Sequence, residues 1–103
     1  MSSESKPAPR FRGAPVDLVV DVRSHIEFWL GHLPGAVCIP VTSLPEGLAK
    51  HDRVNATSRI LVYCASGNRS ASAASLLKAA GYRNVVDGGG FAAASEHFTP
   101  AVA

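Results

Sequence analysis

A series of short apolar runs interrupted by helix signals is the feature that most limits what this chain can fold into. The segments that predict strands are 18–20, 36–41, 60–63 and 84–86. A short, continuous run rich in β-branched residues is typical of a strand buried on both faces. Such strands occur mainly in parallel sheets, whose crossover connections place helices over the sheet.

Each predicted strand is followed by a segment with helical character. We expect helices over 24–30, 43–50, 70–80 and 91–98, and a tight loop at 88–90. Ser24 with Glu27 has the spacing of a capping box, and Ser43 with Glu46 repeats it. Gly81 stands where a glycine commonly ends a helix. The alternation predicts an α/β fold, with a mostly parallel central sheet flanked by helices on both faces in three α/β/α layers.

A chain of 103 residues has room for one domain. We expect the domain to occupy 17–103 and the polar segment 1–16 to be a disordered basic tail.

The tail carries three basic residues and one acidic residue, and the remaining chain has seven of each sign. A neutral body does not predict a nucleic-acid-binding face, and no apolar run is long enough for a transmembrane helix. The N-terminus has no apolar core of a secretory signal, so we expect a cytoplasmic protein.

The third predicted strand ends in a cysteine, Cys64, which precedes the longest predicted helix. Ligands of open parallel sheets bind at the carboxyl ends of the strands, and a thiol there faces the positive end of the helix dipole. Backbone N–H groups of a curled loop act in the same direction. Both effects stabilise the thiolate, which is the nucleophilic form of cysteine. The candidate loop residues are Ala65, Ser66, Gly67, Asn68, Arg69 and Ser70.

The side chains of this loop suit the binding of an anion. Gly67 permits backbone conformations that are closed to residues with a Cβ atom. Ala65 and Ser66 are too small to block the mouth of the loop, and no acidic side chain within it opposes an anion. Arg69 offers a fixed charge and planar donors to an oxyanion, and we expect Ser70 to cap the helix.

Four motifs, in this order along the chain, resemble those of the rhodanese family of sulfurtransferases. They are Val20–Arg23, Gly31–Ala36 leading into Ile39–Pro40, Cys64–Ser70, and Gly81–Tyr82 followed by Gly89–Phe91. The resemblance extends over about 17–98. It departs from the family at Ala94, where family members often have a tryptophan, and this difference bears on the packing of the last helix.

The resemblance implies a two-step transfer of sulfur. Cys64 would attack the sulfane sulfur of a small anionic donor such as thiosulfate, and the resulting persulfide would pass its sulfur to cyanide or a thiol. A protein that accepts the sulfur is a further alternative. The resemblance also makes Asp21 and Arg23 a pair that supports the loop from the neighbouring strand. It implies no cofactor and no metal.

Two other functions compete with this interpretation. Cysteine phosphatases and arsenate reductases also use a loop from cysteine to arginine, but in the phosphatases five residues separate the two, whereas four separate Cys64 from Arg69. Rhodanese-like domains also serve as persulfide carriers or as binding modules for a protein partner. The presence of Cys64 does not separate an enzyme from a carrier.

The remaining chemical groups have structural interpretations. We expect Cys38 to be buried and inert inside its strand, and His32 to be structural. Phe28 and Trp29 are expected to be core aromatics. The two cysteines and four histidines show no ligand spacing typical of a zinc site.

Overall fold

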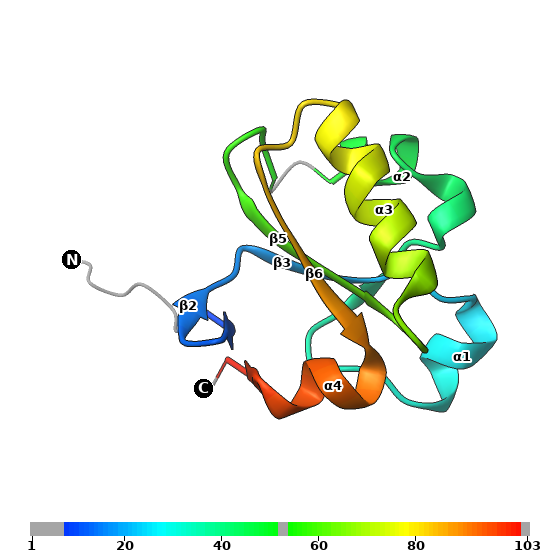
Figure 1. Cartoon of the computed structure of the whole chain (residues 1–103), viewed down its shortest axis with the longest axis vertical. Coiled ribbons are helices and arrows are strands. Elements are labelled where there is room, and N and C mark those ends of the chain that lie inside the picture. The colour runs from blue at the N-terminus through cyan, green and yellow to red at the C-terminus, as the bar shows by residue number, and fades with distance from the viewer. Residues whose placement is uncertain (1–7, 52–53, 102–103) are drawn as a thin grey trace.

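A computed structural model describes residues 8–51 and 54–101, and a four-stranded parallel sheet forms its centre (Figure 1). The strand order is β4-β3-β5-β6. The strands are β3 (Leu18–Asp21), β4 (Val37–Cys38), β5 (Arg59–Cys64) and β6 (Asn84–Gly90). Every adjacent pair is parallel. The expected parallel sheet is therefore confirmed.

Helices cover both faces of this sheet and complete three α/β/α layers. They are α1 (His25–Leu30), α2 (Glu46–Ala49), α3 (Asn68–Ala79) and α4 (Phe91–Glu96), with a short 3-10 helix η1 (Val41–Ser43). Leu48 of α2 and Leu77 of α3 pack on one face, whereas Ala94 of α4 and Phe28 of α1 pack on the other. The expected three-layer fold is therefore also confirmed.

The side chains of β5 alternate between the two faces. Ile60, Val62 and Cys64 belong to the cluster beneath α2 and α3, and Leu61 and Tyr63 belong to the cluster beneath α4. All five are fully buried. This alternation follows from the twofold periodicity of a strand, and it directs the side chain of Cys64 toward α3.

The chain leaves the two central strands, β3 and β5, toward opposite edges of the sheet. The chain passes from β3 to β4 on one side, then crosses back to β5 and β6 on the other. The carboxyl ends of β3 and β5 therefore form the switch point at which open α/β sheets bind ligands. Asp21 ends β3 and Cys64 ends β5.

The N-terminal segment differs from its prediction. The strands β1 (Arg10–Phe11), β2 (Ala14–Pro15) and β7 (Phe98–Thr99) form a second, antiparallel sheet of order β2-β1-β7. Phe11 is fully buried in the cluster beneath α4. The expected disorder is therefore wrong for residues 8–16, because one apolar side chain anchors a segment of polar composition. Residues 1–7 of the expected tail lie outside the described residues.

Several element boundaries also differ. The strand expected over 36–41 is reduced to two residues and followed by η1. Ser43 does not cap α2, whose N-cap is Pro45 without a side-chain hydrogen bond. The glycines at 88–90, expected as a tight loop, are the end of β6. By contrast, the capping box of Ser24 and Glu27 is formed as predicted, and α1 ends at Gly31.

Helix α1 carries the largest error in predicted burial. Phe28 packs inward, as expected, but the side chain of Trp29 is 83% exposed, and Ile26 and Leu30 are also exposed. The prediction of a core tryptophan is therefore wrong. A short helix at the edge of the domain has only one face against the core, and Phe28 already occupies it.

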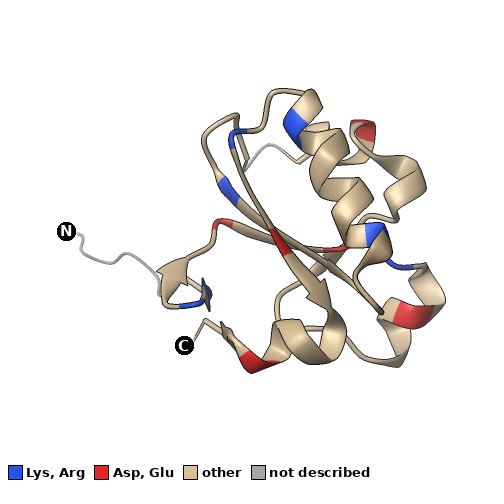
Figure 2. Ribbon diagram, in the orientation of Figure 1, with Lys and Arg blue, Asp and Glu red and all other residues tan. Residues whose placement is uncertain are grey.

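Charged residues of both signs are interspersed over the ribbon (Figure 2). In the part of the chain that the structure describes, no helix is long and apolar enough to cross a membrane.

Candidate active site

Cys64 lies at the junction of β5 and the loop that leads into α3. Its side chain is fully buried, while Ala65, Ser66 and Asn68 on the same loop are exposed. A reagent must therefore enter the loop to reach the sulfur atom. The small size and neutral character of the exposed side chains leave that entrance without a bulky obstacle.

Gly67 gives the loop its curled shape. Its φ of 107° lies in the region that favours glycine, and its backbone N–H donates to Cys64 Sγ over 2.9 Å. Gly67 is also the N-cap of α3. The sulfur consequently faces the N-terminal end of a twelve-residue helix, where the partial positive charge of the helix dipole is concentrated.

These groups decide the direction in which the pKa of Cys64 shifts. Burial raises the pKa of the thiol, but hydrogen bonds from the Ser70 hydroxyl and from the backbone N–H groups of Ser70, Gly67 and Ser66 lower it. The hydrogen bonds outweigh burial, and the pKa of Cys64 is lower than that of a free cysteine. The site therefore favours the thiolate, the nucleophilic form.

Ser70 has a different place from the one expected. Helix α3 begins at Asn68, so Ser70 lies within the first turn and does not cap it. Its side chain is fully buried, and its Oγ lies 3.1 Å from the Gly67 carbonyl oxygen, a second acceptor for the one hydroxyl proton that also serves Cys64. Ser70 thus holds the curled loop closed from the side of the helix.

Arg69 does not project freely toward a ligand. Its Nη1 and Nη2 atoms donate to Glu27 Oε1 and Oε2 of α1 over 2.7 and 2.9 Å. Hydrogen bonds from Arg69 first, and from the Ser24 backbone second, lower the pKa of Glu27 to about 2. The loop itself contains no acidic side chain, as expected, but α1 supplies one. The sequence identifies Glu27 only as a capping-box residue, and no local pattern shows its second role.

Asp21 and Arg23 form an ion pair behind the loop. Arg23 Nη2 lies 2.7 Å from Asp21 Oδ2, and both side chains are buried. Arg23 Nη2 also donates to the Gly31 carbonyl oxygen over 2.6 Å, and its guanidinium lies over the rings of Phe91 and Tyr63 at 4.8 and 5.7 Å. The pair therefore braces the turn after α1 and the end of β5, directly before Cys64.

Comparison with known proteins gives the family. The profile of the rhodanese-like domain matches residues 8–96, which is most of the chain. The protein belongs to the rhodanese-like domain family. The fold agrees: a rhodanese from E. coli with anions has a TM-score of 0.69 at 26% identity, covering 81% of this chain and 96% of that one. A human single-domain sulfurtransferase has a TM-score of 0.61 at 26% identity, covering 68% and 72%.

Curated relatives include longer proteins. The tRNA uridine(34) hydroxylase of Sodalis glossinidius is 34% identical over 83 residues, and the match covers 73% of this chain. The corresponding protein of Salmonella arizonae is 32% identical over 80 residues. This chain spans about a quarter of the length of these relatives, 23% in both cases. The similarity is thus confined to one portion of these relatives.

A close approach of β6 completes this rhodanese-like loop. A Cβ atom added at Gly90 would lie 2.6 Å from the Ala65 carbonyl oxygen and 3.3 Å from Ser66 Cα. Gly90 therefore allows the end of β6 to pack directly on the backbone after Cys64. This role is not evident from the sequence, in which three consecutive glycines predict a separate tight loop.

Cys38 and His32 lie outside the loop. Cys38 is half-buried, and its Sγ donates to the Arg23 carbonyl oxygen over 3.6 Å. Burial raises the pKa of Cys38, which opposes thiolate formation, although the expectation of full burial is wrong. The ring of His32 stacks on Phe28 with centroids 3.7 Å apart, in agreement with a structural role.

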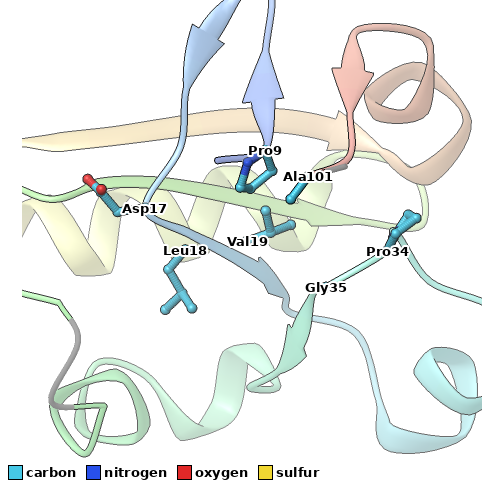
Figure 3. Close-up of a pocket in the computed structure, with 7 residues that line it drawn as sticks. All are labelled: Pro9, Asp17, Leu18, Val19, Pro34, Gly35 and Ala101. Atoms are coloured by element: carbon cyan, nitrogen blue, oxygen red, sulfur yellow. The ribbon is translucent and has the colours of Figure 1, made fainter. Parts of the chain in front are cut away.

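A pocket of about 160 Å³ is drawn in Figure 3, and no residue of the cysteine loop lines it. It is lined by Pro9, Asp17, Leu18, Val19, Pro34, Gly35 and Ala101. Asp17, Leu18 and Val19 lie at the start of β3, and Pro34 and Gly35 precede β4. The pocket therefore lies at the amino ends of these two strands, opposite to the switch point. Within residues 8–51 and 54–101, no group of three His, Cys, Asp or Glu side chains could hold a metal ion.

Proposed function

We propose that this protein is a sulfurtransferase that carries a transferable sulfur atom on Cys64 as a persulfide. The observation that carries the proposal is the hydrogen bond from the Gly67 N–H group to the buried sulfur of Cys64. A backbone N–H group can only donate to the sulfur, and a thiolate accepts such a hydrogen bond better than a thiol does, so this donor favours the anion before and after the reaction. Membership of the rhodanese-like domain family supports the same chemistry.

The first step loads the enzyme. The Cys64 thiolate attacks the outer sulfur of thiosulfate, the S–S bond of thiosulfate breaks, and its electron pair leaves with sulfite. The product is a persulfide anion on Cys64. The N–H groups of Ser66, Gly67 and Ser70, which favour the thiolate, are placed to stabilise the persulfide anion as well.

The second step returns the enzyme to its starting state. A nucleophilic acceptor, cyanide or a thiolate, attacks the terminal sulfur of the persulfide. The new bond forms as the Cys64 S–S bond breaks, and the thiolate of Cys64 is regenerated. The two half-reactions share one covalent intermediate, so ping-pong kinetics are expected. A free thiolate of this kind fits a reducing compartment, which supports the cytoplasm as its place of action.

The test is sulfur transfer from thiosulfate to cyanide by matched cysteine variants. Cys64→Ser is expected to abolish thiocyanate formation, and Cys38→Ser to retain most of it. An aryl phosphate serves as the rival substrate, because phosphatases also use a cysteine loop. Equal loss of activity in two folded variants, or phosphatase activity that depends on Cys64 without thiosulfate turnover, would refute the proposal.

A further inference from the structure

Helix α1 carries an exposed apolar face beside the cysteine loop. The side chains of Ile26, Trp29 and Leu30 are 72%, 83% and 75% exposed. At 100° per residue these three positions share one side of the helix, and Phe28 on the opposite side packs into the core. A cluster of three large exposed apolar side chains on so small a domain marks an interaction site.

The position of this face is fixed by Glu27, which lies between it and the loop. Glu27 holds Arg69 by two hydrogen bonds of 2.7 and 2.9 Å, so α1 is attached to the second residue of α3, five positions after Cys64. Figure 1 shows α1 beside the end of α3 from which the loop emerges. Anything that covers the apolar face consequently stands at the entrance to Cys64.

The charges around the entrance indicate what kind of molecule fits. Arg69 and Glu27 neutralise each other, and the exposed residues Ala65, Ser66 and Asn68 are uncharged. Once the persulfide has formed, this surface therefore has no net charge with which to attract a charged acceptor, and it fits an acceptor whose surroundings are uncharged and apolar. The sulfur of Cys64 is fully buried, so a partner must also insert a narrow, protruding group.

We propose that the apolar face formed by Ile26, Trp29 and Leu30 docks a protein segment that presents a cysteine between apolar residues and receives the sulfur. This inference rests on the proposed function and names its acceptor. The thiolate of the segment attacks the terminal sulfur of the Cys64 persulfide. A persulfide forms on the segment, the Cys64 S–S bond breaks, and Cys64 regains its thiolate.

Trp29 allows binding to be measured without any catalysis. It is the single tryptophan of the chain, and its exposed indole should emit at long wavelength until a partner covers it. The probes are two peptides of equal length with one central cysteine, flanked by Leu and Phe in the first and by Glu in the second. The experiment uses Cys64→Ser protein, so that no sulfur is exchanged during the titration.

The apolar peptide is expected to shift the Trp29 emission to shorter wavelength with saturation, and the acidic peptide to bind at least tenfold more weakly. Ile26→Ser should weaken the binding of the apolar peptide about tenfold. Leu76→Ser, which removes a partly exposed apolar side chain further along α3, should leave binding unchanged.

Equal affinity for both peptides, or no shift in the Trp29 emission at all, would overturn the inference. A shift that appears with rising protein concentration alone would show that a second copy covers the face, and would overturn it too.

Transfer kinetics provide the second readout. With protein loaded from thiosulfate, Trp29→Ser should lower the ratio of kcat/KM for the apolar peptide to that for cyanide about tenfold, and Leu76→Ser should not change it. An unchanged ratio in Trp29→Ser would contradict the docking face, while cyanide turnover would still support the sulfurtransferase. If the unsubstituted protein transfers no sulfur to cyanide, the proposed function is refuted. The fluorescence titration would still show whether the apolar face binds the peptide.

Discussion

Arg69 of the cysteine loop and Glu27 of α1 form an ion pair through two parallel hydrogen bonds of 2.7 and 2.9 Å. The pair joins the helix after β3 to the helix after β5, and so fixes the loop from outside. Each side chain is about one-third exposed, which limits the pair's contribution to stability to about 1 kcal/mol. Its larger effect is electrostatic, because the carboxylate of Glu27 neutralises the positive charge of Arg69, the cationic residue of the cysteine loop.

Releasing Arg69 from its partner should improve the capture of thiosulfate. Glu27→Gln keeps a capping side chain for Ser24 but removes the negative charge. We expect the KM for thiosulfate to fall up to about fivefold, equivalent to about 1 kcal/mol. Arg69→Ala leaves Glu27 unpaired and should raise the KM by a similar factor, with kcat less affected. A steady-state comparison at neutral pH tests both, because the pKa of Glu27, lowered to about 2, keeps it ionised there.

The double variant Glu27→Gln/Arg69→Ala is the control for this comparison. With both charges removed, its KM should lie between those of the single variants. If Glu27→Gln raises the KM as much as Arg69→Ala does, the pair acts by positioning the loop and the electrostatic explanation is wrong.

The pH dependence of alkylation tests the environment of Cys64. Its pKa is lowered below that of a free cysteine, so iodoacetamide should modify Cys64 with a midpoint at lower pH than a model thiol. Ser70→Ala removes one hydroxyl that stabilises the thiolate and should move this midpoint to higher pH. Peptide mapping separates Cys64 from Cys38, whose raised pKa predicts a midpoint at higher pH. A Ser70→Ala profile identical to that of the unsubstituted protein would show that the backbone donors suffice.

The contact between β6 and the loop can be tested with one methyl group. In Gly90→Ala the new Cβ would meet the Ala65 carbonyl oxygen at 2.6 Å, so the loop must move. We expect a loss of about 1–3 kcal/mol in the free energy of unfolding and at least a tenfold loss of sulfur transfer.

Gly35→Ala is the matched control for this substitution. Gly35 has a φ of 80° but nothing within 4 Å of an added Cβ. It should cost about 1 kcal/mol in the free energy of unfolding through backbone strain alone, with transfer activity retained. Equal activity of the two variants, measured on folded protein, would disprove the role assigned to Gly90.

The buried ion pair of Asp21 and Arg23 should matter mainly for stability. Asp21→Asn leaves the Arg23 charge buried without its counterion, which typically costs about 3–5 kcal/mol. Urea unfolding should show this loss. Asp17→Asn is the control, because Asp17 is exposed and accepts a single backbone hydrogen bond from Arg59, so its loss should be about 1 kcal/mol or less. Similar losses in the two variants would contradict the bracing role.

Much of the fold is readable from the sequence because its parallel strands are buried on both faces. The runs around Val20 and Val62 are continuous and apolar, and turn signals such as Gly31 and Gly81 bound the helices. Short elements are less predictable, since their position depends on tertiary contacts. Phe11 orders a polar segment by entering the core, and Trp29 stays outside because Phe28 fills the one inward position.

The cysteine loop could likewise be located from Cys64, Gly67 and Arg69, which lie close together in the sequence. The partners of these residues could not, because they come from distant elements. Glu27 is 42 positions from Arg69, and Gly90 meets Ala65 only because β6 pairs with β5. Such relationships depend on the order of strands in the sheet, which local patterns do not encode.

The most direct measurement of the central claim is the mass of the protein after exposure to thiosulfate. Protein treated with thiosulfate without a reductant, then digested under conditions that preserve persulfides, should carry one additional sulfur atom on the peptide that contains Cys64. Cyanide should remove it and release thiocyanate in equal amount. Cys38→Ser should give the same result, and Cys64→Ser none. An added sulfur on Cys38, or none on Cys64 in folded protein, would contradict the account.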